Sequence, residues 1–390
     1  MSGLRFLSRP GAVLFMCLFA SQAAMLVLSP TLPEVAQEFG ISSATAGQLR
    51  AISGATGGLT ALVLATAARR PGLRELLSGG AALVALASVI SAAAPSFAVL
   101  AAAQGILGVG IGLLVAVGIA AAREWAPPEQ RAHVLAWAIV GMPAAWIVGM
   151  PVVGAVSQAG WRVAWLAVPT VAALVALVLV RLRPADPATR RTGAAASAWR
   201  NADVARFTLG ELLANAAWAS VLTYSGTLLL GSYDVSPAVV GLGLGAGAVA
   251  MVPGAFTGRR GAARPTPALL TGLTAIQGCA VLVLGAVRPT AAVTLAVFTA
   301  MAFVNGRRSM VASALGMDTA PQDTVAVMSM RAAANQFGYL LGAAAGGLAL
   351  GLGGFPALGL TLAALYAGAA LIHSPARIRS PRPVPQGAHS

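Results

Sequence analysis

The sequence predicts an all-α integral membrane protein, with about twelve transmembrane helices in two six-helix bundles that are parallel repeats. Three observations lead to this fold class. The chain of 390 residues is 58% hydrophobic and 9% charged, with a mean hydropathy of +0.81, whereas a soluble chain carries about a quarter charged residues. Its apolar runs have roughly the 20-residue length that a bilayer requires. Finally, loop sequences recur at a fixed spacing.

The first bundle is predicted to occupy residues 1–180. Its first apolar run, Gly11–Leu28, favours a retained helix over a cleaved signal peptide, because of its length and the many runs that follow. The polar stretch that contains Glu34 and Glu38 then predicts an outer loop. The remaining five runs are Ala46–Ala67, Ser78–Ala94, Phe97–Ala122, Ala132–Gln158 and Trp161–Val180.

Residues 181–204 predict a cytoplasmic linker, because they are polar and rich in Arg and Pro. The second bundle is predicted at residues 205–373, and the Pro- and Arg-rich residues 374–390 predict a disordered cytoplasmic tail. The runs of the second bundle are Ala205–Leu230, Pro237–Thr257, Pro267–Val287, Thr290–Leu315, Val325–Leu350 and Pro356–Ile372.

The net charge of +14 predicts an orientation in the membrane. Most arginines fall in short clusters on one side of the predicted spans, so the positive-inside rule places both termini in the cytoplasm. Nucleic-acid binding would need a basic face on a folded domain instead. All basic residues are arginine, as in GC-rich coding, which favours a bacterial plasma (inner) membrane. The sequence contains no catalytic, nucleotide-binding, cofactor-binding or metal-binding motif. We therefore expect that the protein is not an enzyme and that it binds no cofactor.

Two loop matches predict the internal repeat. The segment ARRPGLR (68–74) resembles GRRGAAR (258–264), and APPEQR (126–131) resembles APQDTV (320–325) at nearly the same spacing. Both matches place the two halves in the same orientation, which predicts two bundles related by an axis along the membrane normal.

Four segments resemble the major facilitator superfamily, and most closely its twelve-span drug and sugar efflux branch. The resemblance covers essentially the whole chain and implies alternating access between two bundles by a monomer. It further implies proton-coupled export, with a small molecule, protons and the lipid bilayer as partners. The four segments are SPTLPEVAQEFGISSATAGQL (29–49), QGILGVGIG (104–112), AREWAPPEQRAHVLAW (122–137) and VGMPVVGAVSQAGWRVAWL (148–166).

The resemblance assigns gating roles and also shows departures. Arg69 and Arg259 match the arginine of the cytoplasmic loop motif, but the aspartate of that motif falls at Ala68 and Gly258. The departures favour an uncoupled facilitator or importer as one alternative, and a transport-dead membrane sensor or scaffold is another. The helix-five motif of the efflux branch corresponds to Gly149, Pro151 and Gly154.

The first run of the second half contains one carboxyl, Glu211, and an ionisable group inside a span marks a functional site by default. Arg331 lies at the same depth in another run of that half. We hypothesise that Glu211 binds protons or acts in gating, with Arg331 as its partner. Arg307 and Arg308 are rival partners. The alternatives are a fixed salt bridge and an interfacial position that permits snorkelling.

Polar and aromatic residues inside the spans are candidate substrate contacts. In the family that the chain resembles, helices one, four, seven and ten line the cavity, and an amide can recognise a substrate without a buried charge. Hydrogen bonds between helices are the alternative. Few charges are expected in the cavity, which favours a neutral or lipophilic substrate. Arg50 is predicted to snorkel, and attraction of an anionic substrate is the alternative. The candidates are Gln22, Gln104, Asn215, Trp218, Asn305 and Asn335.

Overall fold

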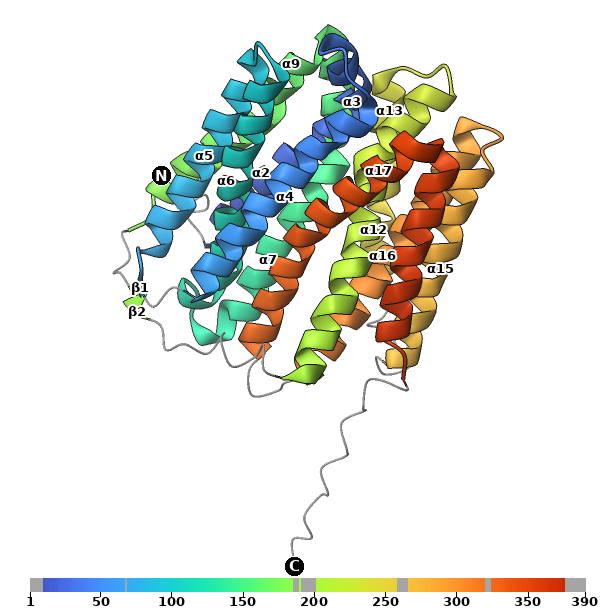
Figure 1. The fold of residues 1–390 in the computed structure, drawn as a ribbon. Helices are drawn as coiled ribbons and strands as arrows, with labels where there is room; N and C mark the ends of the chain where they lie inside the picture. Colours follow the sequence, from blue (N-terminus) through green and yellow to red (C-terminus); the bar gives the residue numbers. More distant parts are fainter. Residues whose placement is uncertain are drawn as a thin grey trace, which may run out of the picture.

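The computed structural model describes residues 10–66, 69–184, 189–190, 201–257, 266–319 and 324–375. These residues are almost entirely helical, and the long helices run side by side between two ends of the molecule (Figure 1). We call the end at which α10 (Val171–Arg181) ends and α12 (Ala202–Ser232) begins the linker end, and the opposite one the far end. Most of the predicted linker and tail lies outside the described residues.

The first half follows the predicted apolar runs closely. Its two π-helical turns each lie at or beside a proline, Pro151 or Pro169, whose missing N–H disturbs regular α-helical hydrogen bonding. The elements before α10 are α2 (Pro10–Leu26), α3 (Leu28–Glu38), α4 (Ser43–Thr66), α5 (Leu73–Ala93), α6 (Phe97–Glu124), η1 (Pro128–Gln130), α7 (Arg131–Ala144), η2 (Ala145–Gly149), α8 (Met150–Val156), η3 (Ser157–Ala159), α9 (Trp161–Trp165) and η4 (Leu166–Thr170).

The outer loop predicted around Glu34 and Glu38 is wrong, because α3 continues the first span as a helix as far as Glu38. Regular helix is interrupted only at Val27. Pro30 lies in the first turn of α3, where a missing N–H costs no helical hydrogen bond. The connection to α4 is therefore reduced to residues 39–42.

The second half also follows the predicted runs. Its last two runs are joined at Gly353 and Gly354, which leave helical geometry, and Gly354 has a positive φ of 65° that suits a residue without Cβ. After α12 the elements are α13 (Pro237–Val249), α14 (Met251–Phe256), α15 (Pro267–Ala286), α16 (Ala291–Thr319) and α17 (Thr324–Ile372).

A pair of two-residue strands at the linker end is a feature that the sequence did not predict. β1 (Arg69–Arg70) pairs antiparallel with β2 (Thr189–Arg190). β1 lies between α4 and α5, and β2 lies in the predicted linker, so backbone pairing joins the linker to the first half at this point (Figure 1).

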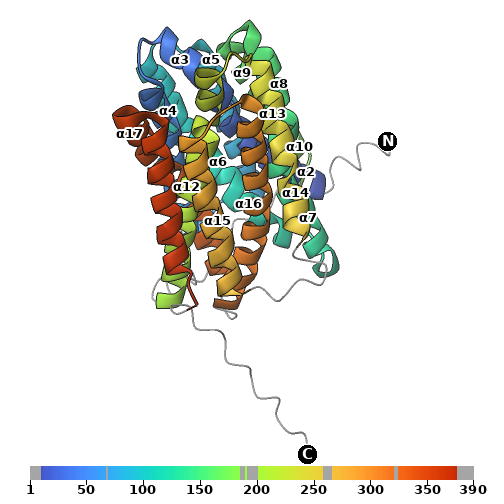
Figure 2. The ribbon, with the colours of Figure 1, turned by 90° about the vertical axis from the view of Figure 1, so that its right-hand side faces the viewer.

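The two halves pack against each other through α4 with α17, α8 with α13, and α3 with α12 (Figures 1 and 2). Glycines permit the close approach. A Cβ built on Gly154 would lie 2.9 Å from the Cα of Gly241, and one on Gly54 would lie 2.6 Å from the backbone nitrogen of Leu340. The contact of Gly154 with Gly241 lies toward the far end, where α13 begins, whereas Gly54 lies at the middle of α4.

Eight helical stretches of the described residues are long and apolar enough to cross a membrane. The chain is therefore a multi-pass membrane protein. Helices α4, α12 and α16, which contain Arg50, Glu211 and Arg308, are not among these stretches, although they run alongside them (Figure 1). The eight are Pro10–Glu38, Leu73–Ala93, Phe97–Ala122, Pro128–Ala159, Trp161–Arg181, Pro237–Ala255, Pro267–Ala286 and Met330–Ile372.

A buried charge cluster as candidate functional site

Glu211 lies on α12 at the centre of a buried charge cluster in the second half. Asn201 starts this helix by accepting hydrogen bonds from the backbone N–H groups of Asp203 and Val204, an ordinary N-cap. Helix α12 then carries Glu211 into the bundle, where its side chain is fully buried. A carboxylate in such surroundings needs partners that replace its lost hydration.

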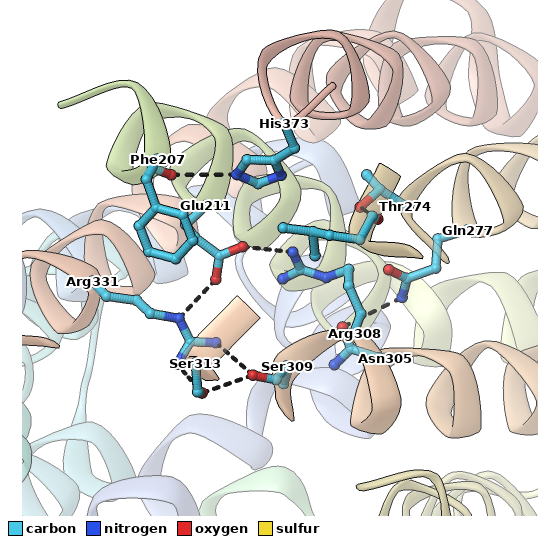
Figure 3. A network of polar contacts seen from close by, with 11 residues as sticks. Phe207, Glu211, Thr274, Gln277, Asn305, Arg308, Ser309, Ser313, Arg331 and His373 are labelled. Atoms are coloured by element: carbon cyan, nitrogen blue, oxygen red, sulfur yellow. Dashed lines mark hydrogen bonds and ion pairs between the residues drawn. The ribbon is translucent and has the colours of Figure 1, made fainter. Parts of the chain in front are cut away.

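Two arginines supply these partners, one to each carboxylate oxygen. Arg308 on α16 donates from Nη1 to Oε1 of Glu211 at 2.7 Å, and Arg331 on α17 donates from Nε to Oε2 at 2.8 Å. Figure 3 shows the two guanidinium groups on different sides of the carboxylate. Glu211 thus ties three helices together through charge-assisted hydrogen bonds.

The arginines differ in their remaining contacts. Arg331 also donates to the Ser313 hydroxyl at 3.0 Å and to the Ser309 backbone oxygen at 3.3 Å, and its side chain is 22% exposed (Figure 3). The Arg308 side chain is 1% exposed, and its Nε and Nη2 have no hydrogen-bond partner. The cluster therefore has two cations for one anion, and unused donors on the more deeply buried cation.

His373, which directly follows the last residue of α17, is the fourth ionisable residue of the cluster. It is fully buried, and its Nε2 lies 3.4 Å from the backbone oxygen of Phe207, one turn before Glu211 (Figure 3). Burial is the main cause that lowers the pKa of His373 below the usual histidine range. The neutral imidazole is favoured, so the charge of the cluster resides on the carboxylate and the two guanidinium groups.

The helix-five residues lie at a close contact between the halves, away from the charge cluster. Gly149 ends the π-helical turn η2, and Pro151 follows it in α8. A Cβ built on Gly245 of α13 would lie 2.8 Å from Cδ of Pro151, and one on Gly154 would lie 2.6 Å from the backbone oxygen of Pro237. This arrangement brings α8 and α13 to backbone contact.

Comparisons with known proteins decide the family. The model of the Major Facilitator Superfamily matches residues 14–327. The chain belongs to the major facilitator superfamily. It is thus a small-molecule transporter by family rather than an enzyme.

Solved structures of transporters have the same fold as this chain. The chain is similar to a bacterial homologue of the human lysosomal transporter Spinster in an inward-facing, unoccupied conformation, with a TM-score of 0.70 and 16% identity, covering 95% of this chain and 93% of that one. It is also similar to a POT family transporter in complex with a thioalcohol-conjugated peptide, with a TM-score of 0.74 and 12% identity, covering 94% and 95%. At such identities the likeness shows the fold alone.

A curated relative matches only part of the chain. It is the "Transcription regulatory protein OpdE" of Pseudomonas aeruginosa (strain PAO1), which is 32% identical over 162 residues. The match spans 41% of this chain and 40% of that protein.

Two of the amides expected to line the cavity of this major facilitator protein bond to neighbouring helices of the first half. Gln22 on α2 is 6% exposed and accepts a hydrogen bond from Nε1 of Trp146 at 3.2 Å. Gln104 on α6 is 1% exposed and donates to the Ser91 hydroxyl on α5 at 3.2 Å. These contacts match the alternative of hydrogen bonds between helices.

Asn305 has a similar contact in the second half, where it accepts from Nε2 of Gln277 at 3.3 Å, beside Arg308 (Figure 3). Asn215 is half-buried, one turn beyond Glu211 on α12, and packs against Gly338 of α17. The half-buried Asn335 lies one turn beyond Arg331.

Trp218 is half-buried and stacks on Phe298 of α16, with ring centroids 6.1 Å apart. Phe298 also lines an apolar pocket within the second half, formed by α12, α13, α15, α16 and α17. Trp218 therefore lies behind one wall of this pocket.

The gating-loop arginines are less fully described. The backbone of Arg69 lies in β1 and pairs with Arg190 of the linker. Arg259 lies outside the described residues. Among the described residues, no group of three His, Cys, Asp or Glu side chains could hold a metal ion.

The preference for snorkelling at Arg50 is wrong, because its side chain is fully buried. Its side chain reaches α2 and α17: Arg50 donates from Nη2 to the backbone oxygen of Met25, and its guanidinium lies 5.8 Å from the ring centroid of Tyr339. Gln336 is a further buried residue that is not among the candidates from the sequence. It is 1% exposed, and its amide atoms have no hydrogen-bond partner. Only its place beside Asn335 could have drawn attention to it.

Proposed function

We propose that this major facilitator protein exports a small molecule by alternating access, in exchange for protons. In this proposal twelve spans form two six-helix bundles, residues 1–180 and 205–373, in a bacterial inner membrane with both termini cytoplasmic. One chain is the working unit, because the duplicated unit supplies both bundles.

The observation that carries the proposal is the cluster around Glu211. While ionised, the carboxylate holds α16 through Arg308 and α17 through Arg331. A proton on the carboxylate removes the charge that both guanidinium groups contact, so the two arginines repel each other and α16 and α17 lose their common tie to α12. Proton binding at Glu211 would thereby favour a different arrangement of these helices.

Close helix contacts provide a surface on which the halves can move. Gly154 and Gly241 bring α8 and α13 together without intervening side chains. The π-helical turn η2 ends two residues before Pro151, at a place where regular hydrogen bonding is already interrupted. In the proposed cycle, Gly149, Pro151 and Gly154 let α8 shift against α13, and Arg69 and Arg259 act at the opposite, cytoplasmic gate.

The proposed substrate has a lipophilic body. The apolar pocket of the second half supports this, since Leu228, Leu244 and Leu362 are among its lining side chains. Asn215, Trp218 and Asn335 are the proposed substrate contacts on the half-buried faces of α12 and α17. Gln22, Gln104 and Asn305 would act by holding helices in place.

A transport assay tests proton coupling. Screening a strain that lacks the gene for lost resistance and lost metabolite export supplies a probe compound, which is then loaded into cells or vesicles. Collapsing the proton gradient should slow export by the wild type. Glu211→Gln should lose the dependence on the gradient, whereas Asp203→Asn, an exposed acid at the start of the same helix, should retain it.

Two other results would reject the carrier role of Glu211. Normal gradient-driven export by Glu211→Gln would exclude it directly. Loss of protein level alone, with normal export per molecule, would assign Glu211 to a fixed salt bridge. Export that ignores the proton gradient altogether would favour the uncoupled facilitator, as the missing acids at Ala68 and Gly258 also do.

A membrane sensor or scaffold is the second candidate, and the name of the 32%-identical relative, a transcription regulatory protein, favours it. This function predicts that Asn215→Ala and Asn335→Ala leave the phenotype of the cell intact. Deleting residues 376–390 should then abolish the phenotype, whereas a transporter should show the opposite pattern.

A further inference from the structure

Arg50 is a buried cation that the proposed proton cycle does not use. It lies on α4, seven residues from the start of that helix at the far end, and its side chain is fully buried. Nη2 donates to the backbone oxygen of Met25, but Nε and Nη1 have no hydrogen-bond partner. Within the described residues Arg50 forms no ion pair.

An unpaired buried guanidinium is unusual, because removing a charge from water is costly unless an opposite charge and hydrogen bonds replace the hydration. Arg162 provides a comparison within the same chain. It donates to both carboxylate oxygens of Glu38 and to the backbone oxygen of Ala94, although its side chain is 35% exposed. The partly exposed Arg162 therefore has a carboxylate partner, whereas the fully buried Arg50 has none among the described residues.

The side chain of Arg50 contacts both halves of the protein. Met25 belongs to α2 in the first half, whereas Tyr339 belongs to α17 in the second. Tyr224 of α12 is also close enough to interact electrostatically with the guanidinium, and it lines the apolar pocket. Arg50 thus lies between the halves, one aromatic side chain away from a space that suits a lipophilic body.

We propose that Arg50 anchors the anionic group of the substrate, so that the transported compound is a lipophilic organic monoanion such as a carboxylate. This inference rests on the proposed transport function and names its substrate class. The anion supplies the missing negative charge and accepts hydrogen bonds from Nε and Nη1. The sequence-based prediction is a neutral or lipophilic substrate, and the proposed monoanion keeps the lipophilic body but replaces the neutral charge.

The competing explanation is a purely structural role, in which Arg50 acts as a latch, that is, a contact that holds the two halves together, since it contacts both. In this chain Arg162 and Arg308 join helices through protein groups alone, and each pairs with a carboxylate. Arg50 is buried with no such partner among the described residues and with two donors unused, which favours the binding of an anionic ligand from outside the chain.

Thermal melting of the purified, detergent-solubilised full chain tests the proposal at constant ionic strength. The probes are acetate, benzoate and 4-phenylbutyrate, each paired with its neutral amide. We expect at least one anion to raise the melting midpoint of the wild type more than its amide does. Arg50→Gln should weaken the apparent affinity for that anion about ten- to a hundredfold, the range of a lost charge-assisted hydrogen bond.

Two variants keep the result interpretable. Arg50→Lys retains the positive charge without the planar fork, so it should still prefer the anion, with weaker affinity than the wild type. Arg206→Gln removes an exposed arginine, and its response should equal that of the wild type. If Arg50→Gln fails to fold, the lysine variant and the wild-type preference for anions still decide the outcome.

Several results would overturn the proposal. One is a wild type that responds equally to every anion and its amide. Another is an Arg50→Gln protein that melts at a different temperature but responds to the anion like the wild type, which would make Arg50 a latch. The assay needs no proton gradient, so proton-coupled export can fail while anion binding holds, and the reverse can also occur.

Discussion

Two charge clusters, one in each half, show how differently the same residue types can be used. In the first half, Glu38 pairs with Arg162 at 2.6 Å at the far end, where their side chains are 42% and 35% exposed. In the second half, Glu211 pairs with Arg308 and Arg331 in the interior of the bundle. The exposed Glu38–Arg162 pair is balanced in charge, whereas the buried cluster carries a surplus cation. Water can stabilise both members of the first, whereas in the second the buried Glu211 and Arg308 depend on protein or ligand groups.

The largest expected effect comes from removing the acid of the buried cluster. Glu211→Gln leaves two guanidinium groups without a carboxylate, so we expect a loss of about 3–5 kcal/mol in the free energy of unfolding, the range for breaking a buried pair. Reversible denaturation in mixed micelles measures it. Glu211→Gln combined with Arg308→Met should recover part of the loss, because one unpaired charge is gone. Equal stability of the single variant and the wild type would contradict the burial of the cluster.

A smaller effect is expected at the turn that positions the exposed cluster. Gly160 has a φ of 114°, in a region that suits glycine, and it directly precedes Trp161 and Arg162. Gly160→Ala should cost about 1–3 kcal/mol, because the alanine must strain or the turn must change. The same denaturation assay checks it. An unchanged free energy of unfolding would show that the turn relaxes freely.

Removing the acid of the exposed cluster should cost less. Glu38→Gln weakens the pair with Arg162 and should lower the free energy of unfolding by about 0.2–1 kcal/mol, the range for exposed pairs. Raising the salt concentration should shrink the difference between variant and wild type. The Glu211 variant should keep its deficit in salt, since a buried pair is screened much less. An equal salt response at both sites would remove the distinction between them.

The smallest effect is expected at Asp203 in the first turn of α12. Its carboxylate lies 3.8 Å from Arg206, and both side chains are more than half exposed. Asp203→Asn should change the free energy of unfolding by no more than about 0.5 kcal/mol. A larger loss of the free energy of unfolding would mean that charge at the start of α12 affects the buried cluster around Glu211, farther along the same helix.

Much of the fold could be predicted because apolar runs and the bilayer length are local properties of the sequence. The boundaries of α6 and α15 illustrate this, since both begin at the predicted residue. The helical form of residues 30–38 could not be predicted from composition, because its acids find their partners in Trp161 and Arg162, far away in the chain.

The candidate site shows the same limit at the level of single residues. Equal depth along two helices sufficed to bring Glu211 and Arg331 together in prediction. The choice between Arg307 and Arg308 depends on the rotation of α16, which the sequence does not specify, and the structure turns Arg308 toward the carboxylate. Rotation of α17 likewise buries Gln336 and leaves its neighbour Asn335 half-buried.

The partial exposure of Arg331 has a consequence for the timing of the proton uptake that we propose at Glu211. Glu211 is fully buried, and Arg331 is the member of the cluster that water reaches. A proton arriving from solvent therefore meets a positive side chain that is fastened to Ser309 and Ser313. In the proposed proton cycle, Arg331 would have to release these contacts before a hydronium ion could approach, and its opening would then set the rate at which the Glu211 carboxyl exchanges protons with the aqueous phase.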